Sequence, residues 1–158
     1  MSEITELSSK LASEGEKLVS FFNTLTDDHW NAVIYTEGTI WTTRNVLSHF
    51  VSAERAFLLS LFPNVVAGGP GASEEFSIDR FNARQQEKTS ELTSHELLEQ
   101  YKAIRSKMID WVNQLSEEDL EKSGRHPFIG WITLREMIKM VYVHNLIHYR
   151  DMRRVIRD

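Results

Sequence analysis

The residues best suited to chemistry are two histidines, His144 and His148, four positions apart in a strongly helical stretch near the end of the chain. On an α-helix this spacing places both side chains on one face, with Cβ atoms about 5–6 Å apart. Their imidazole nitrogens can then reach one ion at about 2.0–2.1 Å. Because the apolar residues Met137 and Val141 share this stripe, we expect the pair to point toward the protein interior.

A third histidine, His49, has the same character, since it lies between Val46 and Ala53 on the apolar stripe of another helical stretch. A lone histidine there would most often be a hydrogen-bonded core residue. Three inward histidines on two helices, however, would need several buried partners. One shared ion supplies a partner for all three, so the pattern predicts one divalent metal ion held by His49, His144 and His148. Three imidazoles suit several ions and do not identify the metal.

Other sequence motifs restrict the chemistry. The segment His144–His148 is not the zinc-protease signature, because Asn145 stands where that signature has its catalytic glutamate. The chain has neither a glycine-rich phosphate loop after a strand nor the serine nucleophile elbow. The three remaining histidines are expected at the surface rather than at the metal: His29, His95 and His126.

The composition describes an ordinary soluble chain. It has 158 residues and a formal charge of −5, and it contains no cysteine, which excludes disulfides, thiolate ligands and a cysteine nucleophile of its own. No apolar run approaches the roughly 20 residues of a membrane span, and the N-terminus does not resemble a signal peptide. Arginine residues near the C-terminus alternate with aspartates, a pattern typical of a solvent-exposed helix end. We therefore expect one domain over residues 1–158, a cytoplasmic location, and neither a membrane nor a nucleic-acid partner.

The elements that must position the histidines are four long helices. Apolar periodicity predicts a first helix from Glu3 to about Leu25 and a second from an N-cap at Thr42 or Thr43 to about Leu61. Capping boxes at Thr93 and Thr133 open the third and fourth. The connections are an extended crossing segment over 29–41, a loop over 62–75, a shorter helical piece over 76–92 and a second crossing segment over 124–132. The pattern predicts an all-α four-helix bundle with long crossing connections.

Three blocks of sequence carry a family resemblance: Ile40-Trp41-Thr42-Thr43-Arg44-Asn45-Val46-Leu47-Ser48-His49, Ile78-Asp79-Arg80-Phe81-Asn82, and His144-Asn145-Leu146-Ile147-His148-Tyr149-Arg150-Asp151. In this order they resemble the DinB-like superfamily, which includes DinB proteins, bacillithiol transferases and a domain of mycothiol-dependent maleylpyruvate isomerase. The resemblance implies a DinB-like four-helix bundle with a metal, zinc or nickel, on His49, His144 and His148. It also implies a homodimer and a low-molecular-weight thiol as cosubstrate.

Three functions follow from these observations. The first is a metal-dependent thiol transferase that joins an exogenous thiol to a small electrophile, since three imidazoles leave a coordination position open. The second is a metal-dependent hydrolase, in which water takes that position. The third is a non-catalytic, stress-related metal-binding module. No residue is assigned a catalytic role, although Asn145 and Arg150 are candidate polar neighbours of the site.

Overall fold

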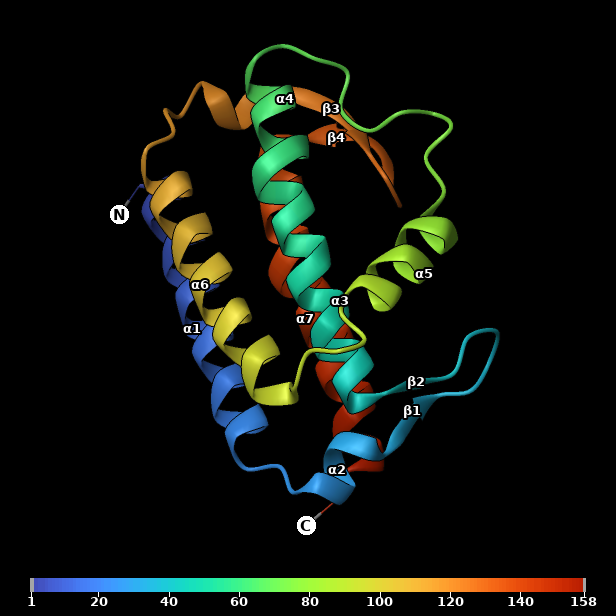
Figure 1. Cartoon of the computed structure of the whole chain (residues 1–158). Coiled ribbons are helices and arrows are strands. Elements are labelled where there is room, and N and C mark those ends of the chain that lie inside the picture. The colour runs from blue at the N-terminus through green and yellow to red at the C-terminus, as the bar shows by residue number, and fades with distance from the viewer. Residues whose placement is uncertain (1, 158) are drawn as a thin grey trace.

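In the computed structural model, which describes residues 2–157, four long helices form a bundle (Figure 1). Helix α1 packs against α6 and α7, and α3 packs against the same two helices, so α1 and α3 lie on a diagonal. Figure 1 also shows that α3 and α6 run in one direction and α1 and α7 in the other. The predicted four-helix bundle is confirmed, with these helix bounds: α1 (Glu3–Asn23), α3 (Thr43–Ala56), α6 (Ser94–Asn113) and α7 (Leu134–Val155).

The two predicted crossing segments exist because each joins helices on a diagonal of the bundle. The first is not simply extended, since it begins within the short helix α2 (Asp27–Asn31) and continues as an antiparallel hairpin of β1 (Val33–Tyr35) and β2 (Trp41–Thr42). The second is an antiparallel hairpin of β3 (Ser123–His126) and β4 (Gly130–Thr133), preceded by the short helix η2 (Asp119–Glu121). Gly38 and Gly130 adopt φ of +72° and +98°, which glycine tolerates and which lets the chain reverse.

The helix starts follow the sequence closely. Thr42, Thr93 and Thr133 each accept the backbone N–H of the residue three positions later, and the side chain there reaches back to the N-cap residue. The capping boxes predicted at Thr93 and Thr133 are thus confirmed. Of the two candidate caps for the second long helix, Thr42 is the N-cap.

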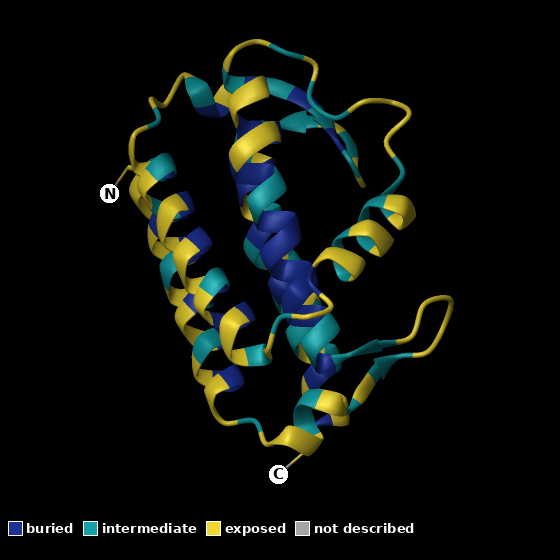
Figure 2. Cartoon of the chain, in the orientation of Figure 1, coloured by how far each residue is buried: buried dark blue, intermediate teal, exposed yellow. Residues whose placement is uncertain are grey.

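The loop predicted over 62–75 is wrong in its first part. After α3 the chain makes a π-helical turn, η1 (Phe57–Leu61), and continues as α4 (Phe62–Val66). Pro63 does not break the helix because it occupies the first turn of α4, where its missing N–H costs little. The next helix, α5 (Ile78–Lys88), is shorter than predicted and has no buried residue, as its colouring in Figure 2 shows.

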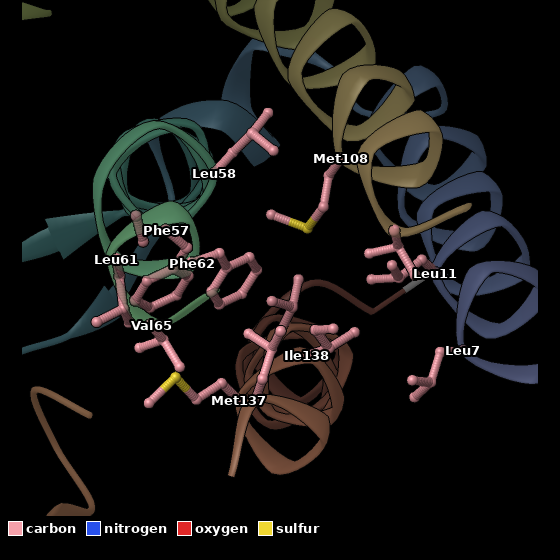
Figure 3. Packing of buried hydrophobic residues seen from close by; sticks show 14 of the residues in the cluster. Leu7, Leu11, Phe57, Leu58, Leu61, Phe62, Val65, Met108, Met137 and Ile138 are labelled. Carbon is pink, nitrogen blue, oxygen red and sulfur yellow. The ribbon is translucent and has the colours of Figure 1, made fainter. Parts of the chain in front are cut away.

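The interior contains two apolar clusters separated by a polar layer. The cluster shown in Figure 3 includes Leu11, Phe62 and Met108, and the second includes Leu18, Phe50 and Tyr101. Between them lies the buried ion pair of Glu54 with Arg105, described below. Over residues 2–157, no helix is both long enough and apolar enough to cross a membrane.

Candidate metal centre

The three predicted histidines meet between α3 and α7. The Nε2 atom of His144 lies 3.1 Å from Nε2 of His49 and 3.0 Å from Nε2 of His148. One nitrogen from each residue lies within 4.8 Å of the other two. Two ligands about 2.0–2.1 Å from one ion, at angles of roughly 90–110°, are about 2.9–3.4 Å apart. The nitrogens therefore have the spacing of adjacent ligands of a single ion.

Hydrogen bonds among the three histidines cannot account for all the short contacts between their ring nitrogens. A ring nitrogen either donates or accepts one hydrogen bond in its plane. Nε2 of His144 can therefore form a hydrogen bond with only one of its two neighbours, although it lies equally close to both. A cation accepts the lone pairs of all three nitrogens at once, so this donor set fits a divalent ion.

A tyrosine and an aspartate orient His148 from behind. The hydroxyl of Tyr35, on β1, lies 2.6 Å from Nδ1 of His148 and donates to Oδ2 of Asp151 at 2.5 Å. Because the hydroxyl proton goes to Asp151, Nδ1 of His148 must carry its own proton and donate to Tyr35. Nε2 then keeps a free lone pair facing the other two histidines. Metal-binding histidines generally have such a partner on their second nitrogen.

Helix α5 brings a fourth side chain to the cluster. It is fastened to α3 by paired hydrogen bonds between Asn45 and Gln86, of 2.9 and 2.8 Å, and by the Ser48–Thr89 contact of 2.6 Å. This docking places the amide of Asn82 in the same cavity wall as His49, where it favours the protonated form of that imidazole and opposes the lowering of its pKa. Although α5 contributes nothing to the core, it therefore closes one side of the site.

Burial keeps the three histidines neutral. Desolvation, followed by repulsion from His148, lowers the pKa of His49 to about 3 although Asn82 opposes the shift. Desolvation and repulsion from its histidine neighbours lower the pKa of His144 to about 2. Desolvation also lowers the pKa of His148, with the charge of Asp151 opposing it. Neutral imidazole is the form that binds metal, so the fold holds the side chains in the state that ligation requires.

The other histidines do not join this cluster. His95 is exposed, as predicted, and the half-buried His29 caps α2. The prediction for His126 is wrong, because its side chain is only 3% exposed and lies against Phe57 and Phe128. Its Nδ1 accepts the backbone N–H of Phe128 at 3.2 Å, and desolvation lowers its pKa to about 4. The short β3 strand, which sequence reasoning did not find, turns this side chain inward.

The two candidate polar neighbours are not placed at the cluster. Arg150 is exposed. Asn145 is buried, and it faces Arg105, which donates to its side-chain oxygen and makes two 2.8 Å bonds to Glu54. Burial works against the charge of Arg105, but Glu54 more than offsets it and leaves the pKa of Arg105 above its ordinary value. Asn145 therefore belongs to the polar layer rather than to the metal cluster.

Two cavities reach the histidines from different sides. The first, here called the chamber, has a volume of about 420 Å³, includes His49 in its wall and is otherwise mostly apolar. The second, here called the groove, is more open, measures about 740 Å³ and includes His148, Tyr35 and Asn45. Asn82 lines both. Each cavity therefore borders a different histidine of the cluster, with Asn82 between them.

Fold and site together define a class: a four-helix-bundle protein with three converging histidines, one from the second long helix and two from the fourth. A family model, the DinB superfamily, matches residues 10–152. The chain therefore belongs to the DinB superfamily. Among proteins of curated function, no sequence matches it.

Solved structures agree on the fold. YfiT from Bacillus subtilis, described as a probable metal-dependent hydrolase with an unusual four-helix bundle topology, superimposes with a TM-score of 0.79 at 16% identity, over 96% of this chain and 85% of that one. An uncharacterised protein from Escherichia coli UTI89 reaches 0.74 at 17% identity, over 96% and 91%. The colibactin self-resistance protein ClbS, solved in complex with double-stranded DNA, reaches 0.74 at 14% identity, over 96% and 94%.

Proposed function

We propose that this protein is a metal-dependent thiol transferase in which His49, His144 and His148 hold one divalent ion, zinc or nickel. The convergence of three neutral imidazole nitrogens carries the proposal. Bound there, a divalent ion supplies positive charge that favours a thiolate over a thiol, as it favours hydroxide over water. In the overall reaction a sulfur–carbon bond forms while a carbon–halogen bond breaks or an epoxide opens. The thiol proton leaves to solvent or to the alkoxide.

Two features favour a thiol as the second reactant. The chain has no cysteine, so a sulfur nucleophile must come from outside. The site also has two approaches of different character, whereas hydrolysis needs room for only one organic molecule. The groove exposes the polar side chains of Tyr35 and Asn45 and suits a hydrophilic thiol, and the chamber suits an apolar electrophile. Asn82, at the boundary, is placed to orient either one.

The test is a thiol titration of cobalt-loaded protein. A thiolate bound to cobalt adds an intense near-ultraviolet charge-transfer band, and the absence of cysteine means that the protein cannot contribute one. With 2-mercaptoethanol between pH 6 and 8, the band should grow with thiol and appear at lower thiol concentration as pH rises, because binding releases the thiol proton. Cobalt that stays bound without such a band at any pH would argue against the transferase.

A metal-dependent hydrolase is the second candidate, and the similarity to YfiT favours it. No aspartate or glutamate of the described chain lines the chamber, so a carboxylate base for hydrolysis would have to come from the groove, which includes Glu37 and Asp79. Turnover of a neutral ester by zinc-loaded protein without thiol would favour this function. Turnover of a haloalkane or epoxide only with thiol would favour the transferase.

The proposal also covers domain organisation, location and partners. We expect a single-domain cytoplasmic protein that works as a homodimer and binds no nucleic acid. The ClbS complex makes the last point worth testing directly. Because this chain has a formal charge of −5, we expect no retention of double-stranded DNA at physiological salt, where binding depends on many phosphate contacts with cations.

A further inference from the structure

The chamber is walled by aromatic and aliphatic side chains from four parts of the fold. Ala56 of α3 and Phe57 of η1 form one side, Phe76 and Phe81 of the α5 region form another, and Phe128 at the turn between β3 and β4 covers the third. No aspartate, glutamate, lysine or arginine of the described residues takes part. Its volume of about 420 Å³ falls within the range of pockets that enclose small ligands.

The polar atoms of the chamber are unevenly distributed. His49, which is buried, and Asn82, which is half-buried, lie together at the histidine cluster. The other polar side chains in the wall, Ser60, Asn64 and Ser73, are exposed residues. An occupant therefore finds hydrogen-bonding groups at the end next to the cluster and an apolar wall along its length.

Phe128 joins the chamber to the candidate metal ligands. Its ring lies 6.2 Å from the ring of His144 in a stacked arrangement, and its side chain is 49% exposed. A molecule seated in the chamber would thus have His49 at one end and, beside it, a partly exposed aromatic ring that also stacks on His144.

We infer that the chamber seats an uncharged aryl or compact cyclic group of the electrophile, with the reacting carbon turned toward His49. An apolar ring gains from burial and from contact with the aromatic wall. A charged group would lose its hydration without finding an ionic partner. The role as substrate seat rests on the proposed function, whereas the preference for an uncharged ring depends only on the wall of the chamber.

The binding test uses two ligands that share a ring and differ in charge, benzyl alcohol and benzylammonium. Full-length protein is titrated with each ligand, both zinc-loaded and with the metal removed, while the methyl resonances of Ala56 and Ile78 are followed by NMR. The metal-free titration separates the effect of the wall from repulsion of the ammonium by the ion. Benzyl alcohol should bind about tenfold more tightly or better, because the ammonium of benzylammonium would lose its hydration without finding an ionic partner in the wall. Equal affinities, or no shift of these methyl groups, would overturn the inference.

Matched variants locate the binding. Ala56→Leu fills the chamber and should weaken benzyl alcohol binding about tenfold, whereas Ala103→Leu, the same change on an exposed face of α6, should leave it unchanged. If Ala56→Leu fails to fold, Phe128→Ser serves instead, because this half-exposed residue can lose its ring with little cost to the core. Retained affinity in a folded variant of either kind would refute the assignment.

Cobalt in place of zinc tests the link to the metal site. Bound at the three histidines, it should broaden the ring protons of benzyl alcohol in the wild-type protein, with zinc-loaded protein as the diamagnetic reference. Binding without broadening, while cobalt occupies the histidines, would show that the chamber is not the substrate seat. Failure of His49, His144 and His148 to bind any ion would overturn the proposed function, and the charge preference of the chamber would still be measurable.

Discussion

Replacing Tyr35 with phenylalanine isolates the part played by the residues behind the candidate metal ligands. The change removes one hydroxyl and leaves the ring, which packs edge-on against Trp41 and His148. It breaks the 2.6 Å contact with Nδ1 of His148 and the 2.5 Å bond to Asp151. His148 then loses the interaction that keeps its proton on Nδ1 and its Nε2 lone pair toward the cluster.

The size of the effect follows from these contacts. A hydrogen bond to a charged group contributes about 1.5–3 kcal/mol, and the value here should lie in the lower part of that range because Tyr35 is only half-buried. Since 1.4 kcal/mol corresponds to a factor of ten, we expect zinc affinity to fall about 10- to 100-fold. The free energy of unfolding of the metal-free protein should change much less, because water can solvate the released groups.

The assay is a competition titration against a chromophoric zinc chelator. Tyr149→Phe is the matched control, because Tyr149 packs against Phe21 and makes no side-chain hydrogen bond within residues 2–157. Asp151→Asn should weaken zinc binding in the same direction as Tyr35→Phe. Unchanged zinc affinity in Tyr35→Phe, with His148 still required for binding, would refute the assigned role of the hydroxyl.

Four further predictions concern the ligands, the interior and assembly. His49→Ala, His144→Ala and His148→Ala should each lower bound metal sharply in elemental analysis, whereas His95→Ala should not; full occupancy without His49 would remove α3 from the site. Glu54→Leu leaves the charge of Arg105 buried without a partner and should lower the free energy of unfolding, measured with denaturant, by about 3–5 kcal/mol. Adding Arg105→Met should restore most of this loss. Because the pKa of His126 is lowered to about 4, the unfolded chain takes up the proton first as pH falls from about 6.5. Between pH 7 and pH 5, the free energy of unfolding of the metal-free wild type should therefore fall by up to about 2 kcal/mol more than that of His126→Gln. Equal decreases would contradict the burial of His126 as the neutral form. Light scattering should give a dimer mass at high micromolar concentration, and a clean monomer would refute the homodimer.

The parts of the fold that sequence could predict are those controlled locally. A threonine three positions before a glutamate or asparagine favours a helix start through contacts within four residues, as at Thr42 and Thr133. The two hairpins could not be read in this way, because strands of two to four residues carry too little pattern. The loop predicted over 62–75 overlooks α4, because a proline such as Pro63 ordinarily ends a helix and the π-helical turn that precedes it has no sequence signal of its own.

The same division applies to the site. The helical spacing of His144 and His148 predicts that they share a site. Asp151, three residues after His148, lies on a neighbouring part of the helix surface, so its role beside His148 could also have been predicted from the sequence. Tyr35 could not, since it is 113 residues away from His148 and reaches it only through the folded hairpin. The ion pair between Glu54 and Arg105 was missed because charged residues within an apolar stripe are ordinarily assigned to the surface.

One signal of that ion pair was present in the first helix. Gly15 interrupts the apolar stripe between Leu11 and Leu18, and glycine inside a helix is unfavourable by about 1 kcal/mol unless packing requires it. A Cβ atom at this position would lie 3.1 Å from Nη1 of Arg105. The same guanidinium donates to the backbone oxygen of Leu11 at 2.8 Å. The missing side chain therefore makes room for a buried arginine.

This arginine bears on the candidate metal centre because it also contacts α7 through Asn145. Asn145, next to His144 in sequence, accepts a hydrogen bond from Arg105, while His144 and His148 face His49. The position occupied by a catalytic glutamate in zinc proteases thus serves here to fix the rotation of α7 about its axis. Since that rotation decides which side chains meet α3, the polar layer in the bundle interior helps to set the geometry of the three histidines.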